Sequence, residues 1–155
     1  MCAPRRIDLS LMLLALAWLC GCASTTPTPA AAGPAATISG FVFRDLNANG
    51  VCDPREPGEP GVTVSAYDAD NQLVASATTD VGGKYVLNPE LDGHKIVEGA
   101  SYIVQFSGLR PGVTSGPAGK DSGTELQFAV GGAADVNYGV FNPDQYVAPK
   151  ATPVK

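Results

Sequence analysis

The chain is poor in the side chains that most enzymes use for catalysis. It has one histidine (His94) and one tryptophan (Trp18) in 155 residues. His94 stands in a segment with no nucleophile motif beside it, so neither a Ser-His-Asp nor a Cys-His arrangement can be built, and a zinc site lacks ligands. We therefore predict that the protein is not an enzyme and that His94 lies on the surface.

Cysteine is too scarce for a disulfide framework. Three of the four cysteines lie within the first 22 residues, so Cys52 stands alone in the rest of the chain. A single thiol has no partner with which to form an intramolecular disulfide. We interpret Cys52 as a packed, inert thiol, with a reactive or intermolecular thiol as the alternative.

Positive charge is also in short supply. The chain has 10 Lys and Arg against 15 Asp and Glu, which gives a formal net charge of -5. Such an excess of acid argues against nucleic acid and against anionic membrane surfaces as partners, and it agrees with cation binding.

The longest apolar run, Leu9 to Gly21, is too short to span a bilayer, which takes about 20 residues. Arg5 and Arg6 precede it, as in the positive region of an export signal. The run leads into Leu19-Cys20-Gly21-Cys22, which resembles a bacterial lipobox. We predict a lipoprotein signal peptide over residues 1–21, with an ordinary secretory signal as the alternative.

The resemblance to a lipobox implies that Cys22 becomes the acylated N-terminus. Cys22 fits better than Cys20 because the small residue Gly21 precedes it, whereas the bulky Leu19 precedes Cys20. Several acyl chains on one residue are enough for stable membrane anchoring. Ala23 after the cysteine resembles a signal for the outer membrane if the cell is Gram-negative; otherwise the outer face of the plasma membrane is expected.

Two segments have a composition that cannot bury a core. Residues 22–37 consist of the lipidation cysteine followed by Ala, Thr, Ser, Pro and Gly without charge, and residues 143–155 contain three prolines. We predict a disordered, extended tether at the front and a disordered tail at the end. The intervening residues 38–142 have a comfortable single-domain size.

This domain shows short strand signals and no convincing helical period. Turn residues such as Gly, Pro, Asn and Asp separate the signals, so we predict an all-β fold: a seven-stranded antiparallel Greek-key sandwich. The expected strands are Ile38–Arg44, Val62–Tyr67, Leu73–Thr79, Lys84–Leu87, Ser101–Phe106, Glu125–Val130 and Asp135–Phe141.

The segment from Asp45 to Glu56 has the spacing of a twelve-residue calcium loop. Oxygen-bearing side chains occupy its positions one, three, five, nine and twelve, and Gly50 is at position six, where the chain must turn sharply. A strand signal precedes the loop and a Pro/Gly-rich segment follows it, so the loop belongs to a β domain. The predicted Ca²⁺ ligands are Asp45, Asn47, Asn49, the backbone carbonyl of Val51, Asp53 and Glu56.

Other acids outside the loop are candidates for auxiliary or weaker metal sites. Asp80 and Asp121 are the main candidates, followed by Asp68 and Asp70. For each of them, a solvated acid in a turn is the favoured interpretation.

Several motifs occur in a fixed order along the domain. They are Gly40-Phe41-Val42-Phe43, the calcium loop, Pro60-Gly61-Val62-Thr63-Val64, Thr78-Thr79-Asp80, Gly83-Lys84-Tyr85 and Ala134-Asp135-Val136-Asn137-Tyr138-Gly139-Val140-Phe141. In this order they resemble the SdrD B-like domains, which are prealbumin-like or CnaB-like sandwiches of bacterial surface proteins. The resemblance implies Ca²⁺ binding and a role as a rigid stalk segment. Some relatives carry a Lys–Asn crosslink; here Asn137 is present but the first strand has no lysine, so we predict no crosslink.

Together these features predict a lipid-anchored protein of the cell envelope with a structural or adhesive role. Its expected partners are the membrane, through the lipid anchor, and a protein at the cell surface. The alternative is a module that binds a small ligand or carbohydrate, for which Tyr67, Tyr85, Tyr102 and Tyr138 would line a face. Packing in the core is the favoured interpretation of these tyrosines.

Overall fold

The computed structural model describes residues 33–88 and 94–148. The predicted signal peptide, Cys22, most of the tether and residues 149–155 lie outside the described residues. Within the described part, no helix is long and apolar enough to cross a membrane.

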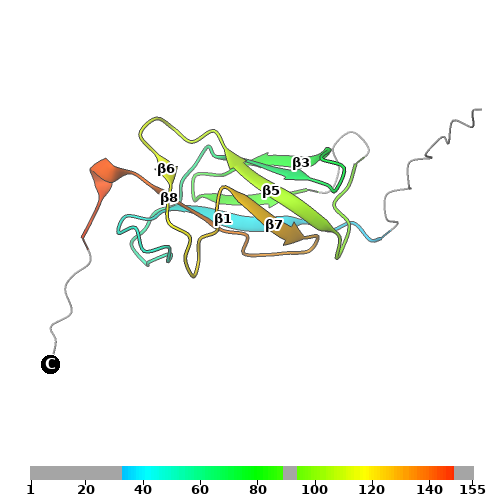
Figure 1. The fold of residues 1–155 in the computed structure, drawn as a ribbon, viewed down its shortest axis with the longest axis horizontal. Coiled ribbons are helices and arrows are strands. Elements are labelled where there is room, and N and C mark those ends of the chain that lie inside the picture. Colours follow the sequence, from blue (N-terminus) through cyan, green and yellow to red (C-terminus); the bar gives the residue numbers. More distant parts are fainter. Residues whose placement is uncertain (1–32, 89–93, 149–155) are drawn as a thin grey trace, which may run out of the picture.

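The described residues form a sandwich of two four-stranded sheets (Figure 1). One sheet has the order β4-β1-β8-β6 and the other has the order β3-β2-β5-β7. The prediction of an all-β sandwich is confirmed. The strands are β1 (Ile38–Arg44), β2 (Thr63–Tyr67), β3 (Leu73–Thr78), β4 (Lys84–Leu87), β5 (Ser101–Ser107), β6 (Thr114–Ser115), β7 (Leu126–Val130) and β8 (Tyr138–Phe141).

The structure differs from the expected strands in two particulars. The two-residue strand β6 adds an eighth strand, which is too short to give a sequence signal. The last strand begins at Tyr138 rather than at Asp135, because Asp135 has a left-handed backbone (φ 63°) that interrupts extended structure.

One strand pair is not antiparallel. β8 runs parallel to β1, with Val42 opposite Tyr138 and Arg44 opposite Val140, whereas the other pairs are antiparallel. A hairpin cannot join parallel neighbours. β8 reaches β1 after β7, which belongs to the opposite sheet, so the chain crosses between the sheets before it pairs with β1.

The core between the sheets comes from the alternation of side chains along the strands. In β5, for example, Tyr102, Val104 and Phe106 are buried and the residues between them are not. The Phe106 ring lies 4.7 Å from the Tyr138 ring and 5.8 Å from the Tyr85 ring, measured between centroids. This aromatic cluster links the two sheets.

A second buried layer lies on the other side of β1. Val42 and Phe43 are both 0% exposed, but neighbouring residues of a strand point to opposite faces of the sheet. Phe43 therefore lies outside the main core, where a Cβ atom on Gly139 would stand 3.0 Å from its ring. The neighbouring Ser122 hydroxyl accepts a hydrogen bond from the Gly139 N–H (2.8 Å). The segment around Ser122 thus covers the outer face of this sheet.

Both ends of the described part pack against the sandwich. The Ala36 N–H donates to the Ile96 carbonyl (2.9 Å). At the other end, a 3₁₀ turn, η1 (Pro143–Gln145), is followed by a hydrogen bond from the Val147 N–H to the Leu46 carbonyl (2.7 Å). Ordered contacts therefore extend slightly beyond residues 38–142 on both sides.

We predict that Phe106→Ala destabilises the protein by about 3–5 kcal/mol, because it opens a cavity in the aromatic cluster that joins the sheets. Urea unfolding measures the loss. The matched control is Phe128→Ala, since Phe128 is 88% exposed and its truncation should stay within about 0.5 kcal/mol. Equal losses in the two variants would contradict this description of the core.

Candidate metal centre

The predicted calcium loop leaves the sandwich at the end of β1. Asp45 follows the last residue of β1 and donates its N–H to the Val140 carbonyl of β8 (2.8 Å). The loop then curls tightly, with Ala48 and Gly50 in the left-handed region (φ 54° and 68°). A Cβ atom on Gly50 would stand 2.7 Å from the Gly119 Cα, so position six needs glycine for space as well as for conformation.

Asp45 organises the interior of the loop. It is 1% exposed, and its two carboxylate oxygens accept hydrogen bonds from separate backbone groups. Oδ1 accepts from the Asn49 N–H (3.0 Å) and Oδ2 accepts from the Gly50 N–H (2.7 Å). Because Asp45 is fixed at the end of β1, these bonds pull the turn back over the start of the loop.

Glu56 closes the other end of the loop in the same way. Its Oε1 accepts from the Leu46 N–H (2.8 Å) and its Oε2 accepts from the Asp53 N–H (3.0 Å). The first and last predicted ligands are therefore both turned into the loop.

The central residues gather around Asp53. Its Oδ2 accepts hydrogen bonds from the side-chain amides of Asn47 (2.7 Å) and Asn49 (3.0 Å). The Asn49 Oδ1 accepts from the Val51 N–H (2.7 Å). The Asn47 Oδ1 is buried and has no hydrogen-bond partner among the described residues. A buried oxygen without a partner is costly, and either an ordered water or a cation satisfies it.

The donor set fits a hard cation such as Ca²⁺, which takes six to eight oxygen ligands. Within residues 33–88 and 94–148, no three His, Cys, Asp and Glu side chains form a group that could hold a metal ion. The three acids of the predicted set, Asp45, Asp53 and Glu56, are therefore not gathered into such a group, and the remaining predicted ligands are two neutral amides and one backbone carbonyl. Each carboxylate oxygen that accepts one N–H keeps a second lone pair for an ion.

Of the auxiliary acids, the structure brings only Asp121 to this loop. The Asp121 Oδ2 accepts from the Cys52 N–H (3.2 Å), and its own N–H donates to the Gly50 carbonyl (3.0 Å). Asp80 instead accepts from the N–H groups of Gly82 and Lys84, within its own hairpin.

The remaining acids also serve turns. Asp68 accepts from the N–H groups of Asp70 and Gln72 at the turn between β2 and β3. The interpretation of Asp68 as a turn acid agrees with these hydrogen bonds, and Asp70 is exposed at the same turn.

The expectation of a packed Cys52 is wrong. Cys52 is an exposed free thiol, and its backbone N–H donates to the Asp121 carboxylate. Partial burial raises the pKa of this thiol, and the negative charges of Glu56, Asp121 and Asp53 raise the pKa further. A raised pKa leaves less thiolate at neutral pH, so the environment does not activate the sulfur.

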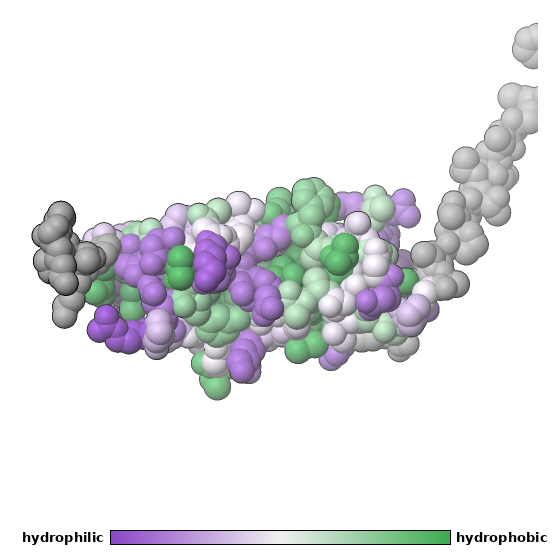
Figure 2. All heavy atoms as spheres, turned by 90° about the horizontal axis from the view of Figure 1, so that it is seen from below, coloured by the Kyte–Doolittle hydropathy of each residue, from purple (hydrophilic) through white to green (hydrophobic). Residues whose placement is uncertain are grey.

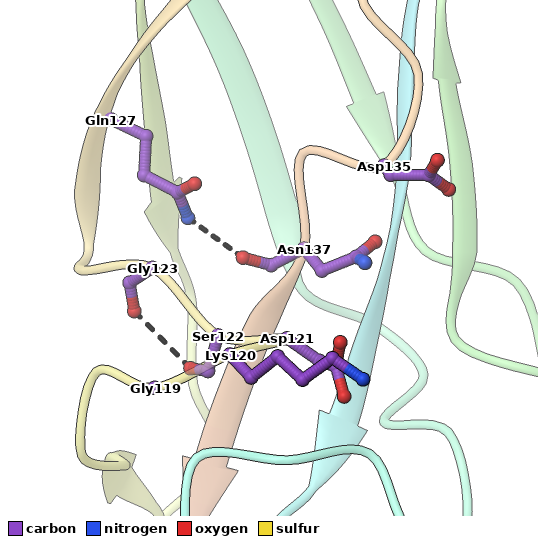
Figure 3. Close-up of a pocket in the computed structure, with 8 residues that line it drawn as sticks. All are labelled: Gly119, Lys120, Asp121, Ser122, Gly123, Gln127, Asp135 and Asn137. Carbon is purple, nitrogen blue, oxygen red and sulfur yellow. Dashed lines mark hydrogen bonds between the residues drawn. The ribbon is translucent and has the colours of Figure 1, made fainter.

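A polar pocket of about 510 Å³ is lined in part by residues 119–123, the segment that contacts the loop at Gly50 (Figure 3). Its lining includes Asn137 and Gln127, and Figure 3 shows the Gln127 amide directed at the Asn137 carbonyl, which accepts at 2.9 Å. The Asn137 side chain itself accepts from the Phe41 N–H of β1 (2.9 Å), so it serves the backbone of the sandwich. The lining residues are Gly119, Lys120, Asp121, Ser122, Gly123, Gln127, Asp135 and Asn137.

Three of the four tyrosines considered for a binding face are buried. Tyr85, Tyr102 and Tyr138 are at most 5% exposed, and their hydroxyl groups bond to Val136, Val97 and Ser115 respectively. Burial raises the pKa of Tyr85 and of Tyr138. The interpretation of these three as packing residues is confirmed, and His94 is exposed as expected.

Sequence reasoning missed a buried acid, Glu59, which lies directly after the loop. It is 1% exposed and is held between two arginines. Its Oε2 contacts the Arg44 Nε at 2.5 Å, and its Oε1 contacts the Arg110 Nε at 2.6 Å. The Pro- and Gly-rich surroundings of Glu59 indicated only a turn. No local signal could have found it, because its second partner, Arg110, lies 51 residues away in the sequence.

Similarity to known proteins defines the class of this domain. The sequence profile of the SdrD B-like domain matches residues 36–137. This match covers most of the chain, so the chain belongs to the SdrD B-like domain family.

Two curated relatives share substantial identity with the chain. Colossin-B of Dictyostelium discoideum is 36% identical over 117 residues, which cover 73% of this chain and 3% of the relative. Serine-aspartate repeat-containing protein D of Staphylococcus aureus is 37% identical over 87 residues, which cover 54% of this chain and 6% of the relative. The chain therefore spans only a small part of the length of these relatives.

Among solved structures, the shaft pilin SpaA of Lactobacillus rhamnosus GG is similar at 14% identity with a TM-score of 0.42. The similarity covers 70% of this chain and 48% of the pilin chain.

We predict that Glu59→Ala destabilises the protein by about 1–3 kcal/mol, because it removes the charged hydrogen-bond acceptor of Arg44 and Arg110, while solvent partly compensates the two arginines. Chemical denaturation measures the change. Glu98→Ala is the control, since Glu98 is exposed and should cost little. If both variants unfold at the same denaturant concentration, the ion-pair cluster does not fix this part of the fold.

Proposed function

We propose that the chain is a lipid-anchored, non-enzymatic protein of the cell envelope whose β-sandwich is stabilised by Ca²⁺. Its role is structural or adhesive, through contacts with a protein partner. The observation that carries the calcium part is the buried Asn47 Oδ1, which has no partner within the described loop although the acids around it are turned inward.

In this proposal Asp45, Asn47, Asn49, Asp53 and Glu56 supply side-chain oxygens and Val51 supplies its carbonyl. Three of these side chains are carboxylates of one twelve-residue loop, and a divalent cation would draw their negative charges together. Asp121 stands beside position eight of the loop and is the auxiliary acid best placed to assist.

The ion would stiffen one end of the sandwich. The loop contacts β8 through a hydrogen bond from the Asp45 N–H to the Val140 carbonyl. Its Gly50 carbonyl accepts from the Asp121 N–H, and its Leu46 carbonyl accepts from the Val147 N–H, which follows the C-terminal 3₁₀ turn. Because these segments are distant in sequence, an ion that orders the loop would also order the contacts between them.

The shape of the domain supports a spacer role. The described chain enters and leaves at opposite ends of the long axis, and the loop after β1 lies at the end away from the N-terminal entry (Figure 1). If Cys22 is the lipid anchor, the tether holds the near end and the calcium loop is presented at the far end. The expected cellular location is the cell envelope, which means the outer membrane in a Gram-negative cell and otherwise the outer face of the plasma membrane.

The carbohydrate alternative loses its main support in the described residues. A sugar-binding face usually needs exposed aromatic rings, and three of the four candidate tyrosines are in the core.

We predict that adding Ca²⁺ to the chelated protein raises its Tm by several degrees, about 4–8 °C for each kcal/mol of binding energy. The double variant Asp45→Ala, Glu56→Ala should show no rise. Calorimetry with and without a chelator measures both.

A single variant separates binding from loop folding. Asn47→Ala removes the unpartnered oxygen and leaves the backbone hydrogen bonds of Asp45 and Glu56 intact, so it should weaken calcium binding more than it lowers the Tm of the chelated protein. Asp70→Ala, at an exposed turn, is the control and should bind as the parent does. A parent Tm that does not respond to Ca²⁺ would refute the calcium proposal.

We predict that Cys22→Ser releases the protein from the membrane fraction and abolishes incorporation of labelled fatty acid. Removing the acylated cysteine removes the anchor, whereas Cys20→Ser should leave anchoring unchanged. Fractionation of cells after metabolic labelling checks this, and membrane association that survives Cys22→Ser would rule out the anchor at this residue.

A further inference from the structure

The strand β7 forms an open edge of the sandwich that lacks the usual protection. It is the last strand of the β3-β2-β5-β7 sheet, and its residues, Leu126 to Val130, include no charge and no proline. Natural edge strands are commonly shortened, bulged or charged to prevent pairing with another chain.

The other three edges carry such protection. β6 has only two residues, β4 carries the exposed Lys84, and the pairing of β2 with the edge strand β3 is interrupted by an irregularity at Ala66/Tyr67. β7 pairs with β5 over five consecutive residues without a register shift. It is therefore a straight, uncharged strand beside solvent.

The exposed side chains of β7 are apolar and lie on one face. Leu126, Phe128 and Val130 are 55%, 88% and 50% exposed. They alternate along the strand, so all three project from the outer face of the sheet, next to Ile103 of β5, which pairs with Phe128. Figure 2, which views the molecule from below the orientation of Figure 1, shows hydrophobic surface exposed among hydrophilic surface.

The same three residues direct their backbone groups toward the open edge. At the two ends of the ladder, the Phe106 N–H donates to the Glu125 carbonyl and the Gly131 N–H donates to the Ala100 carbonyl. In an antiparallel ladder, hydrogen-bonded and non-hydrogen-bonded pairs alternate. The odd-numbered residues of β7 therefore bond to β5, and Leu126, Phe128 and Val130 face outward.

Phe128 is the centre of this edge. The Leu126 carbonyl accepts from the Thr124 hydroxyl (2.5 Å), and the Val130 carbonyl accepts from the Ala133 N–H (2.9 Å). Phe128 has neither its N–H nor its carbonyl engaged in a described hydrogen bond, so both are free on the residue with the most exposed side chain.

We propose that β7 is a self-association edge, at which a second copy of this chain adds its own β7 antiparallel across a two-fold axis at Phe128. The two Phe128 residues then exchange both backbone hydrogen bonds, and Leu126 of each copy lies opposite Val130 of the other. The two four-stranded sheets join into one continuous sheet with a shared apolar stripe.

Charge favours a second copy in this register. The protein is acidic overall, so two copies repel unless their contact is free of charge. The edge strand meets this condition. The nearest acid, Glu125, would lie opposite Gly131 of the other copy and not opposite another acid.

The size of the contact sets its strength. A fully buried aromatic side chain contributes about 150–250 Å². Leu126 and Val130 are smaller and already about half buried within each copy, so three side chains from each copy fall short of the roughly 1,200 Å² that stable complexes bury. The pairing is therefore weak in dilute solution and forms where copies are concentrated, as on a shared surface.

Cysteine crosslinking of the full chain in cells tests the proposal. In a Cys52→Ser background, Phe128→Cys places two thiols opposite each other across the axis, within reach of a disulfide. The matched control is Val81→Cys, since Val81 is 95% exposed but lies at the turn between β3 and β4. We expect mild oxidation to give several-fold more covalent dimer with Phe128→Cys than with Val81→Cys.

A second measurement does not depend on thiols. Sedimentation of the detergent-solubilised full chain should show a mean mass that rises with concentration, and Phe128→Lys, which sets two like charges opposite each other, should remain monomeric. Equal crosslinking at positions 128 and 81, a crosslinked product that contains a different protein, or a parent that stays monomeric at all concentrations would overturn the proposal.

Discussion

The burial of β1 on both faces and its pairing on both edges is the constraint on which the rest of the structure depends. Val42 faces the core and Phe43 faces the layer outside the sheet, and both are completely buried. β4 holds one edge of the strand and β8 holds the other. The loop that starts at Asp45 therefore leaves from a fixed point, and the backbone bonds of Asp45 and Glu56 can define its shape.

Glu59 extends this constraint past the loop. It follows the loop, yet it is bound to Arg44, the last residue of β1, and to Arg110 from the connection between β5 and β6. The entry and exit of the loop are thus held together by an ion pair, while the loop interior is held by carboxylates that accept backbone N–H groups. The two sets of acids have different tasks, and the buried oxygen that lacks a partner, the Asn47 Oδ1, lies in the loop interior.

The sequence predicted those parts of the fold that depend on local patterns. Short strand signals and the turn residues between them indicated most strand bounds to within a residue or two. The parallel pairing of β8 with β1 could not be predicted, because it depends on which sheet the chain joins after β7. The burial of Glu59 was hidden for the same reason, since its second partner, Arg110, lies 51 residues away. In the loop, the glycine at position six predicted the sharp turn at Gly50. The exposure of Cys52 and the contact of its N–H with Asp121 could not be predicted, because Asp121 lies far from the loop in the sequence.

The parallel arrangement of β1 and β8 has a mechanical consequence. β1 is the first strand and β8 is the last, so a pull that separates the two termini acts along both strands in opposite directions. The ladder between Val42–Arg44 and Tyr138–Val140 then resists in shear, with its hydrogen bonds strained together instead of opening one after another. When the chain is stretched between its two ends, the force needed to separate β1 from β8 would be the largest that the domain opposes to unfolding.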